Sequence, residues 1–289
     1  MGIRRLNLGN VDIMISFPGG MFRGLVGLAK ANGAGQAEHV VPLPAKLVTE
    51  SPEARALQQR VDAIEWYHTL DLGNDVVTPG WFDLRHLLDQ YPIPSRLDGK
   101  RVLDVATFDG FWAYEFERRG AAEVVALDID SFAEVDMNPR IRRQKDSAYF
   151  SRKTGEGFAL AHEALHSKVR RQVCNVYDLS PERLGKFDFV FVSDLLLHLM
   201  NPMKALNNIA SVTAGQAVIA EVYDPHLPDH LMKYESGEGH NIWWSIGLGA
   251  LRQMVDDAGF RDVELCNQFK LGYRGQKPVL AHAAFRAFA

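Results

Sequence analysis

Residues 102–112 have the sequence Val-Leu-Asp-Val-Ala-Thr-Phe-Asp-Gly-Phe-Trp, and the architecture predicted for the chain follows from them. An apolar strand that carries Asp104 near its end leads into a tight loop, which opens a helix. In an open α/β sheet, ligands bind at such a first strand-to-helix turn, beside the point where the strand order reverses. The next strand ends at Asp128, where a carboxylate can accept both ribose hydroxyls of an adenosine. Either acid alone has a simpler explanation, because parallel strands often end in polar residues.

From Pro94 onward, short apolar strands alternate with helical stretches. This alternation predicts an α/β fold, a Rossmann-like seven-stranded and mostly parallel sheet with helices on both faces. The strands are expected at 101–105, 123–127, 169–175, 187–192 and 217–222, with 263–267 and 281–288 as a closing edge pair. The helices are expected at 111–119, 157–167, 202–212 and 246–258, the last ended by Gly259.

The sequence before this alternation predicts a separate N-terminal region. Residues 1–95 are expected to form an arm and a helical lid or extension, and residues 96–289 the ligand-binding domain with a basic insertion at about 131–168. The first 50 residues, rich in Gly and aliphatics, predict a loosely structured arm. A capped helix is expected from Ser51, and a second helix over 83–91 that stops before the prolines that follow.

Composition excludes several classes of protein. With 289 residues and 47% hydrophobic content, the chain is neither disordered nor fibrous. Lys plus Arg is 32 and Asp plus Glu is 36, a net charge of −4 that is not typical of a nucleic-acid binder. No apolar run approaches the roughly 18 residues that span a bilayer, so no membrane partner is expected. Two cysteines fit a cytoplasmic protein, and the histidine spacing predicts no metal site.

The loop at 104–110 indicates the class of cofactor. A dinucleotide enzyme needs Gly-x-Gly-x-x-Gly so that the backbone can approach a pyrophosphate, but the corresponding positions are Ala106, Phe108 and Phe111. No phosphate-binding Gly-x-x-x-x-Gly-Lys-Ser/Thr loop occurs either. The remaining candidate is an adenosine cofactor without phosphates.

These residues resemble the class I S-adenosylmethionine (SAM) dependent methyltransferases, from about residue 101 to the C-terminus. The loop is similar to that of a subgroup with Asp-x-Gly-Thr-Trp-Asp-Gly-Phe. Trp-Tyr-His-Thr-Leu-Asp-Leu at 66–72 and Thr-Pro-Gly-Trp-Phe-Asp at 78–83 also resemble this subgroup. Its members are described as similar to tRNA wobble-uridine methyltransferases of the 5-carboxymethoxyuridine type.

The resemblance implies SAM as the cofactor and S-adenosylhomocysteine (SAH) as the product. The loop would hold the methionine end, Asp128 the ribose and Ile129 the adenine face, while Asn175 and the backbone of Val176 would hydrogen-bond the adenine. The cofactor residues implied in this way are Asp104, Ala106, Thr107, Phe108, Asp109, Gly110, Asp128, Ile129, Asn175, Val176 and Ser193. Because Ala106 replaces a glycine, the loop is expected not to need a strongly positive φ there.

Methyl transfer from a sulfonium mainly requires that the acceptor be aligned, with a base only where the acceptor keeps its proton. His198, in the loop after the fourth strand, is the leading base because its ordinary pKa lies near neutrality; a packed histidine is the alternative. Asp194 is expected to bind the acceptor or the methionine amino group, unless it is a solvated loop acid. Glu221 ends the fifth strand and completes the predicted catalytic set.

Substrate contacts are expected from the upstream lid and from two later loops. The candidates are Tyr67, His68, Trp81, Tyr223, His226, His240, Trp243 and Trp244. Loop exposure explains the polar residues equally well, and hydrophobic packing explains the tryptophans. Ser245 is expected to cap the last large helix.

The acceptor falls into one of two classes. In the carboxymethyltransferases that the chain resembles, a tyrosine holds the extra carboxylate of carboxy-SAM; here that position is Leu197, so ordinary SAM is expected. A small-molecule hydroxyl or amine is the first choice of acceptor. tRNA is the second, because residues 140–171 contain nine Lys or Arg against three acids. A non-catalytic SAM-binding or scaffold protein is the third hypothesis.

Overall fold

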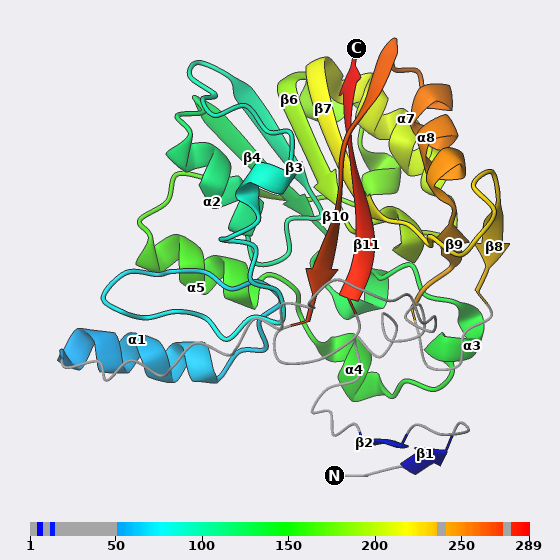
Figure 1. The fold of residues 1–289 in the computed structure, drawn as a ribbon. Helices are drawn as coiled ribbons and strands as arrows, with labels where there is room; N and C mark the ends of the chain where they lie inside the picture. Colours follow the sequence, from blue (N-terminus) through cyan, green and yellow to red (C-terminus); the bar gives the residue numbers. More distant parts are fainter. Residues whose placement is uncertain (1–4, 8–11, 15–50, 236–240, 274–278) are drawn as a thin grey trace.

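The computed structural model describes residues 5–7, 12–14, 51–235, 241–273 and 279–289 of the chain. Its seven-stranded sheet has the order β10-β11-β7-β6-β3-β4-β5 (Figure 1). The strands are β3 (Arg101–Val105), β4 (Glu123–Asp128), β5 (Arg170–Val173), β6 (Phe187–Ser193), β7 (Thr213–Val222), β10 (Asp262–Gly272) and β11 (Val279–Phe288). β3 to β7 are parallel, and β10 and β11 close the sheet as an antiparallel edge pair, as predicted.

The strand order reverses between β3 and β6, which places a ligand crevice there. Val105 of β3 is in register with Leu127 of β4 and with Val192 of β6. The carboxyl ends of these three strands therefore lie level, and the loops that follow them meet at one edge. This register brings together residues that are nearly 90 positions apart in the sequence.

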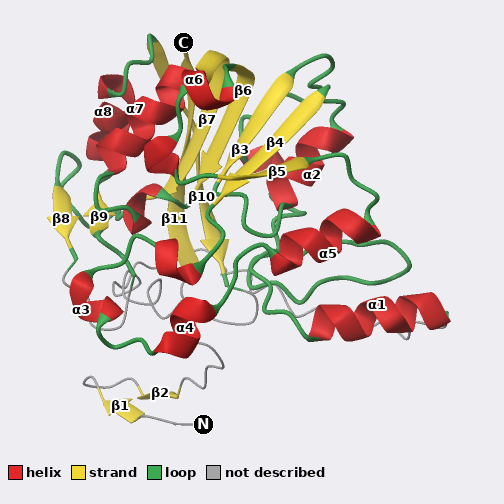
Figure 2. Cartoon of the chain, turned by 180° about the vertical axis from the view of Figure 1, so that it is seen from behind, coloured by secondary structure: helices red, strands yellow, loops and turns green. Residues whose placement is uncertain are grey.

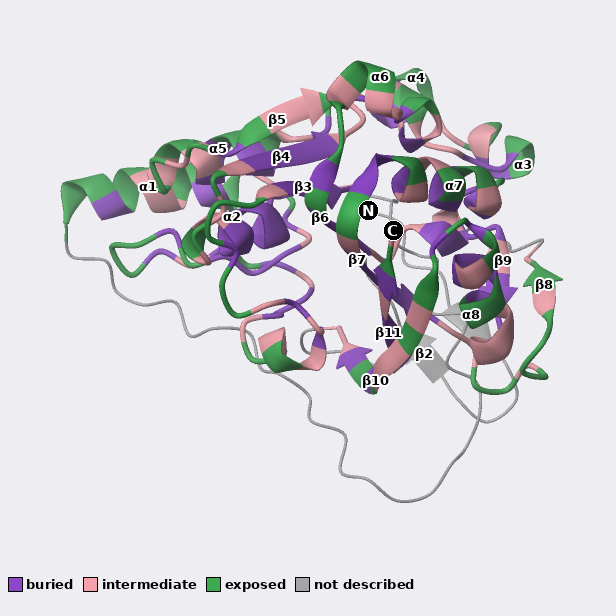
Figure 3. Cartoon of the chain, turned by 90° about the horizontal axis from the view of Figure 1, so that it is seen from above, coloured by how far each residue is buried: buried purple, intermediate pink, exposed green. Residues whose placement is uncertain are grey.

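Side chains of the parallel strands alternate between two hydrophobic cores. On one face, Val102 and Phe191 pack with α2 (Phe111–Arg118) and α5 (Glu156–Ala164). On the other face, Leu103 and Val192 pack with α7 (Pro202–Val212) and α8 (Leu248–Asp257). β3 and β4 are almost wholly buried between these layers (Figure 3). The predicted fold class is confirmed.

The N-terminal region packs against the same core as α2. Ser51 caps α1 (Pro52–Asp62), as predicted, by accepting a hydrogen bond from the backbone N–H of Ala54 at 3.0 Å. The helix predicted over 83–91 is wrong, because only the short 3₁₀ helix η2 (Leu88–Gln90) forms there. The carboxylate of Asp83 instead accepts hydrogen bonds from the backbone and guanidinium of Arg85, which favours a turn. Most of the predicted arm lies outside the described residues; within it, β1 (Arg5–Asn7) pairs with β2 (Asp12–Met14).

An insertion between β4 and β5 lies beyond the carboxyl ends of the parallel strands. It contains η3 (Phe132–Glu134), α3 (Pro139–Arg142) and α4 (Ser147–Ser151). Figure 2 shows α3 and α4 below these strand ends. Among the described residues, no helix combines the length and the apolar character that crossing a bilayer requires.

The start of α8 also differs from the prediction. Ser245 does not cap the helix, because it lies in β9 (Trp244–Ile246), which pairs with β8 (Met232–Tyr234). Its hydroxyl donates a hydrogen bond to Oε1 of Glu235 at 2.6 Å, and Gly247 stands at the N-cap. Gly259, with a φ of 101°, follows the helix as predicted.

Candidate functional site

The loop after β3 is wound more tightly than its sequence suggested. Ala106 has a φ of 60° and Phe108 a φ of 47°. The expectation that Ala106 avoids a positive φ is therefore wrong. The loop is held from both sides, because Oδ2 of Asp104 accepts hydrogen bonds from Oγ1 of Thr107 at 2.6 Å and from the backbone N–H of Ala113 at 3.1 Å. These bonds outweigh the steric cost of a left-handed alanine, about 1–2 kcal/mol.

We expect Ala106→Gly to raise the free energy of unfolding by ~0.5–1 kcal/mol. Glycine removes the strain of the left-handed conformation, and its greater entropy in the unfolded chain offsets part of that gain. Ala113→Gly, in helical α2, is the matched control and should lower it by ~1 kcal/mol. Urea unfolding measures both variants. Equal destabilisation by the two substitutions would contradict a strained Ala106.

Asp128 lies at the tip of β4 beside this loop. Its Oδ2 accepts a hydrogen bond from the backbone N–H of Phe108, and its Oδ1 from that of Ile129, both at 2.7 Å. Each oxygen keeps further capacity to accept a bond from a ligand. Burial raises the pKa of Asp128 to about 6, and burial, with the charge of Asp128 nearby, raises that of Asp104 to about 7.

Asp109 connects the loop to the N-terminal region. Its Oδ2 accepts hydrogen bonds from the backbone N–H groups of Tyr67, at 2.7 Å, and of His68, at 2.9 Å. A Cβ added at Gly157 would lie 2.5 Å from its Oδ1, so the carboxyl group also packs closely against the start of α5. Burial raises the pKa of Asp109 to about 7. In this arrangement Asp109 holds the segment that covers the site.

Asp194 follows β6 in a left-handed conformation, with a φ of 54°. One of its carboxylate oxygens lies 2.8 Å from Nε2 of His282, and the other accepts the hydroxyl of Ser193 at 3.1 Å. Burial by itself would raise the pKa of Asp194, but these two partners hold it below its ordinary value. His282 is fully buried on β11 and was not predicted, since a histidine in an apolar strand resembles a core residue.

Glu221 and His198 flank Asp194. Oε1 of Glu221 accepts hydrogen bonds from the backbone N–H groups of Leu195 and Leu196, at 3.0 and 3.1 Å, and burial raises its pKa well above the ordinary value. His198 ends η5 (Leu196–His198), with its Nδ1 2.5 Å from the backbone oxygen of Asn241. Burial lowers the pKa of His198.

One cavity of about 1020 Å³, open to solvent, is lined by several of these residues, though not by Asp109, Glu221 or His282. Its lining includes six of the predicted cofactor residues: Asp104, Ala106, Phe108, Asp128, Ile129 and Ser193. It also includes Tyr67, His68, Asp194 and His198. Eight further lining residues were not predicted: Val105, Trp112, Val135, Tyr149, Thr154, Phe191, Leu195 and Asn241. Three of these, Val135, Tyr149 and Thr154, come from the insertion, for which the sequence predicted only a basic charge.

The other predicted residues lie away from this lining. Among the cofactor candidates, these are Thr107, Asp109, Gly110, Asn175 and Val176. Oδ1 of Asn175 accepts the backbone N–H of Tyr177 at 3.0 Å. Among the substrate candidates, Tyr223 bonds Gln268, His226 is exposed, and the indoles of Trp243 and Trp244 donate to backbone oxygens. His240 lies outside the described residues.

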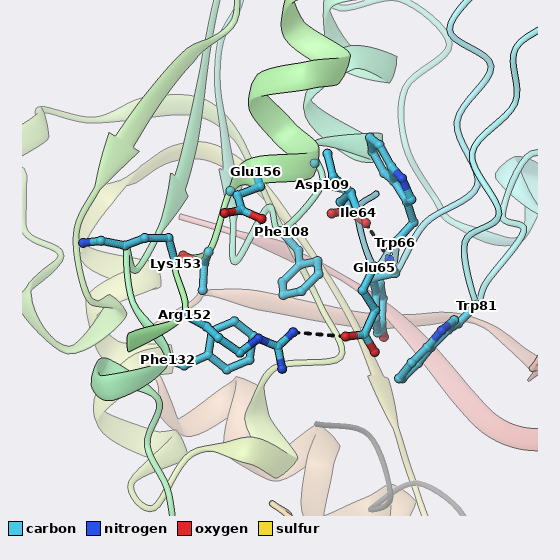
Figure 4. A pocket seen from close by; sticks show the side chains of 14 residues that line it. Ile64, Glu65, Trp66, Trp81, Phe108, Asp109, Phe132, Arg152, Lys153 and Glu156 are labelled. Carbon is cyan, nitrogen blue, oxygen red and sulfur yellow. Dashed lines mark hydrogen bonds and ion pairs between the residues drawn. The ribbon is translucent and has the colours of Figure 1, made fainter. Parts of the chain in front are cut away.

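A second hollow of about 620 Å³ lies on the other side of Phe108. Tyr67, Phe108 and Thr154 line both spaces. Figure 4 shows Arg152 and Glu65 joined across this hollow, with their side chains 3.0 Å apart. Trp81, predicted as a substrate contact, lines this hollow and not the larger cavity.

The basic segment is partly neutralised by the chain itself. Four of its nine cations lie 3.0–3.6 Å from carboxylates: Arg152 from Glu65, Lys153 and Arg171 from Asp130, and Arg170 from Glu123. The guanidinium of Arg142 donates to the backbone oxygen of Ala133. The charge excess counted in the sequence therefore overstates the charge available to a partner.

Residues 81–265, more than half of the chain, match the model of a family described as a methyltransferase domain. A curated relative, a tRNA U34 carboxymethyltransferase from Dichelobacter nodosus (strain VCS1703A), is 27% identical over 178 residues. That match covers 60% of this chain and 49% of the relative, so the chain matches about half of the relative's length.

Among solved structures, the N-terminal domain of EvdMO1, crystallised in the presence of SAH and D-fucose, is similar to this chain with a TM-score of 0.54. The two are 16% identical, and the match covers 84% of this chain and 99% of that domain. The same domain with SAH bound has a TM-score of 0.52 at 17% identity, covering 81% and 96%. At these identities the similarity establishes the shared fold.

Proposed function

The chain belongs to the methyltransferase-domain family, and we propose that it transfers a methyl group from SAM to an oxygen or nitrogen nucleophile of a small molecule. The observation that carries this proposal is the single cavity that joins Asp104 and Asp128, at the β3 and β4 tips, to Asp194 and His198 after β6. A donor at the first end and an acceptor at the second would meet inside one space.

The residues at the first end fit SAM. The two oxygens of Asp128 each have capacity left for one ribose hydroxyl, and Ile129 is placed beside them to pack on the adenine. Asp104 and the loop up to Gly110 are proposed to hold the methionine end. Carboxyl groups suit a ligand that carries a sulfonium and an ammonium, because the positive charges of bound SAM favour the ionised carboxylates.

When bound, SAM supplies a methyl carbon that is already electrophilic. Tyr67 and His68, held over the cavity by Asp109, would exclude water and align the acceptor. The backbone oxygen of Asn241 can only accept, so Nδ1 of His198 carries a hydrogen. In the neutral imidazole, which burial favours, Nε2 is then free to take the acceptor's proton.

tRNA remains the second candidate, and the observation that favours it is the similarity of the chain to a tRNA U34 carboxymethyltransferase. The paired cations of the insertion argue for the small molecule instead, since phosphate contacts need charge that is free to displace counterions. A cytoplasmic location remains part of the proposal, because both cysteines are free thiols.

The test is incubation of the protein with isotopically labelled SAM and two fractions of a cell extract, small metabolites and bulk tRNA. We expect a labelled methyl group in a small metabolite. Label in tRNA nucleosides would favour the second candidate, and in that case Arg142→Glu with Arg143→Glu should abolish salt-sensitive tRNA binding. Binding of SAH without transfer to either fraction would support a non-catalytic protein.

A further inference from the structure

The charges around the cavity are unevenly distributed. In the part of the chain that the structure describes, its lining holds three carboxyl groups, those of Asp104, Asp128 and Asp194, and no Lys or Arg. The first two stand at the end proposed for the methyl donor. Asp194 follows β6, on the other side of β3 from Asp128, at the end proposed for the acceptor. Among the described residues, the acceptor end therefore has a carboxylate and no fixed cation in its lining.

Asp194 is kept ionised although it is buried. His282 and Ser193 each bind one of its oxygens, and both oxygens retain capacity to accept another hydrogen bond. Its charge also raises the pKa of Glu221, whose second oxygen, Oε2, is buried without a hydrogen-bond partner. A second negative group brought next to Asp194 would be repelled by its charge.

Two further polar atoms at this end have no partner. Nδ1 of His68 is buried without a hydrogen bond, 4.0 Å from the carboxylate of Asp109, and the side chain is 7% exposed. Oδ1 of Asn241 is likewise buried and unpaired, and its residue lines the cavity. An amide oxygen can only accept hydrogen bonds. Buried groups of this kind normally find a partner, so a ligand with a hydrogen-bond donor would satisfy the side-chain oxygen of Asn241.

Resting on the proposed methyl transfer, we propose that the acceptor is an uncharged or cationic hydroxyl or amino compound whose reacting end carries no carboxylate or phosphate, and that Asp194 recognises it by accepting its O–H or N–H. In the reaction, the lone pair of the acceptor oxygen or nitrogen forms the new bond to the methyl carbon. The carbon–sulfur bond breaks with its electron pair left on sulfur. An amine keeps one N–H bonded to Asp194 and passes another proton to Nε2 of His198, which in a protonated amine happens before it attacks. A hydroxyl has one proton, which is bonded to Asp194 and passes to that carboxylate.

The test compares three probes with one skeleton and a single polar end: phenethylamine, 2-phenylethanol and phenylacetate. Their binding to the SAH-saturated protein is measured by saturation-transfer NMR and by calorimetry at low salt. We expect the amine and the alcohol to bind at least ~10-fold more tightly than the carboxylate. In Asp194→Asn the preference for phenethylamine over phenylacetate should fall at least ~5-fold, whereas the exposed control Asp89→Asn should keep it.

The outcomes separate this inference from the proposed function. If phenylacetate binds as tightly as phenethylamine, or if no probe binds the SAH-saturated protein at millimolar concentration, the inference on the acceptor is overturned. If the protein does not bind SAH at all, the proposed function fails instead. The order in which the three probes bind the wild-type protein tests the inference even where Asp194→Asn does not fold.

Discussion

Asp128→Ala should weaken the binding of SAH at least ~100-fold. Two hydrogen bonds from ribose hydroxyls to an ionised carboxylate are worth about 1.5–3 kcal/mol each, and a loss of 2.7 kcal/mol is already about 100-fold in affinity. The substitution also removes the acceptor that holds the backbone N–H of Phe108 at 2.7 Å, so the loop after β3 loses one of its anchors. Titration calorimetry with SAH measures the change directly.

Two companion variants make this experiment specific. Asp128→Asn keeps one acceptor oxygen and loses the charge, so its affinity should lie between those of the wild type and the alanine variant. Asp89→Ala removes an exposed acid of the N-terminal region and should leave SAH binding unchanged. If Asp128→Ala bound SAH within about 3-fold of the wild type, a difference worth under 1 kcal/mol, the ribose contact would be refuted, and with it the proposed orientation of SAM.

The same contact predicts a dependence on pH. Because burial raises the pKa of Asp128 to about 6, a growing share of the free protein carries a protonated Asp128 as the pH falls below that value. SAH binding favours the ionised form, so affinity should fall by up to tenfold per pH unit below about 6. Asp128→Asn should remove this part of the dependence.

The sequence placed Asp104 and Asp128 at the cavity but missed His282, for a physical reason. An acid at the end of an apolar strand can be recognised from the neighbouring sequence alone, and Asp104 and Asp128 were both predicted in this way. The pairing of Asp194 with His282 joins residues 88 positions apart and depends on the antiparallel return of β11. Only the sheet topology brings these two together.

Two other differences arise because tertiary contacts overrule local preference. Ala106 adopts a left-handed conformation that alanine alone avoids, since the carboxylates of Asp104 and Asp128 fix the loop around it. In the insertion, the sequence shows an excess of Lys and Arg, but the side chains that line the cavity are apolar or carry a hydroxyl. Tyr149 and Thr154 line the cavity, whereas Arg152 and Lys153 of the insertion pair with Glu65 and Asp130.

Asp109→Ala should lower the free energy of unfolding by about 3 kcal/mol or more. It leaves the backbone N–H groups of Tyr67 and His68 without an acceptor, and each buried unsatisfied donor costs about 1–3 kcal/mol. Both bonds reach the same oxygen, so Asp109→Asn can keep them and should be far less destabilising. Asp89→Ala, an exposed acid of the same N-terminal region, should change stability by less than about 0.5 kcal/mol.

The pH dependence of these variants distinguishes a buried carboxyl from mere packing. Burial raises the pKa of Asp109 in the folded protein to about 7, above the 3.8 of an unperturbed Asp, so between these values the folded state binds a proton that the unfolded state does not. Its contribution to stability therefore falls as the pH rises from about 4 through 7. Relative to the wild type, Asp109→Asn should gain about 1–3 kcal/mol between pH 5 and pH 8. Urea unfolding at both pH values measures this gain, and a difference that stays constant with pH would show that the group is not protonated on folding.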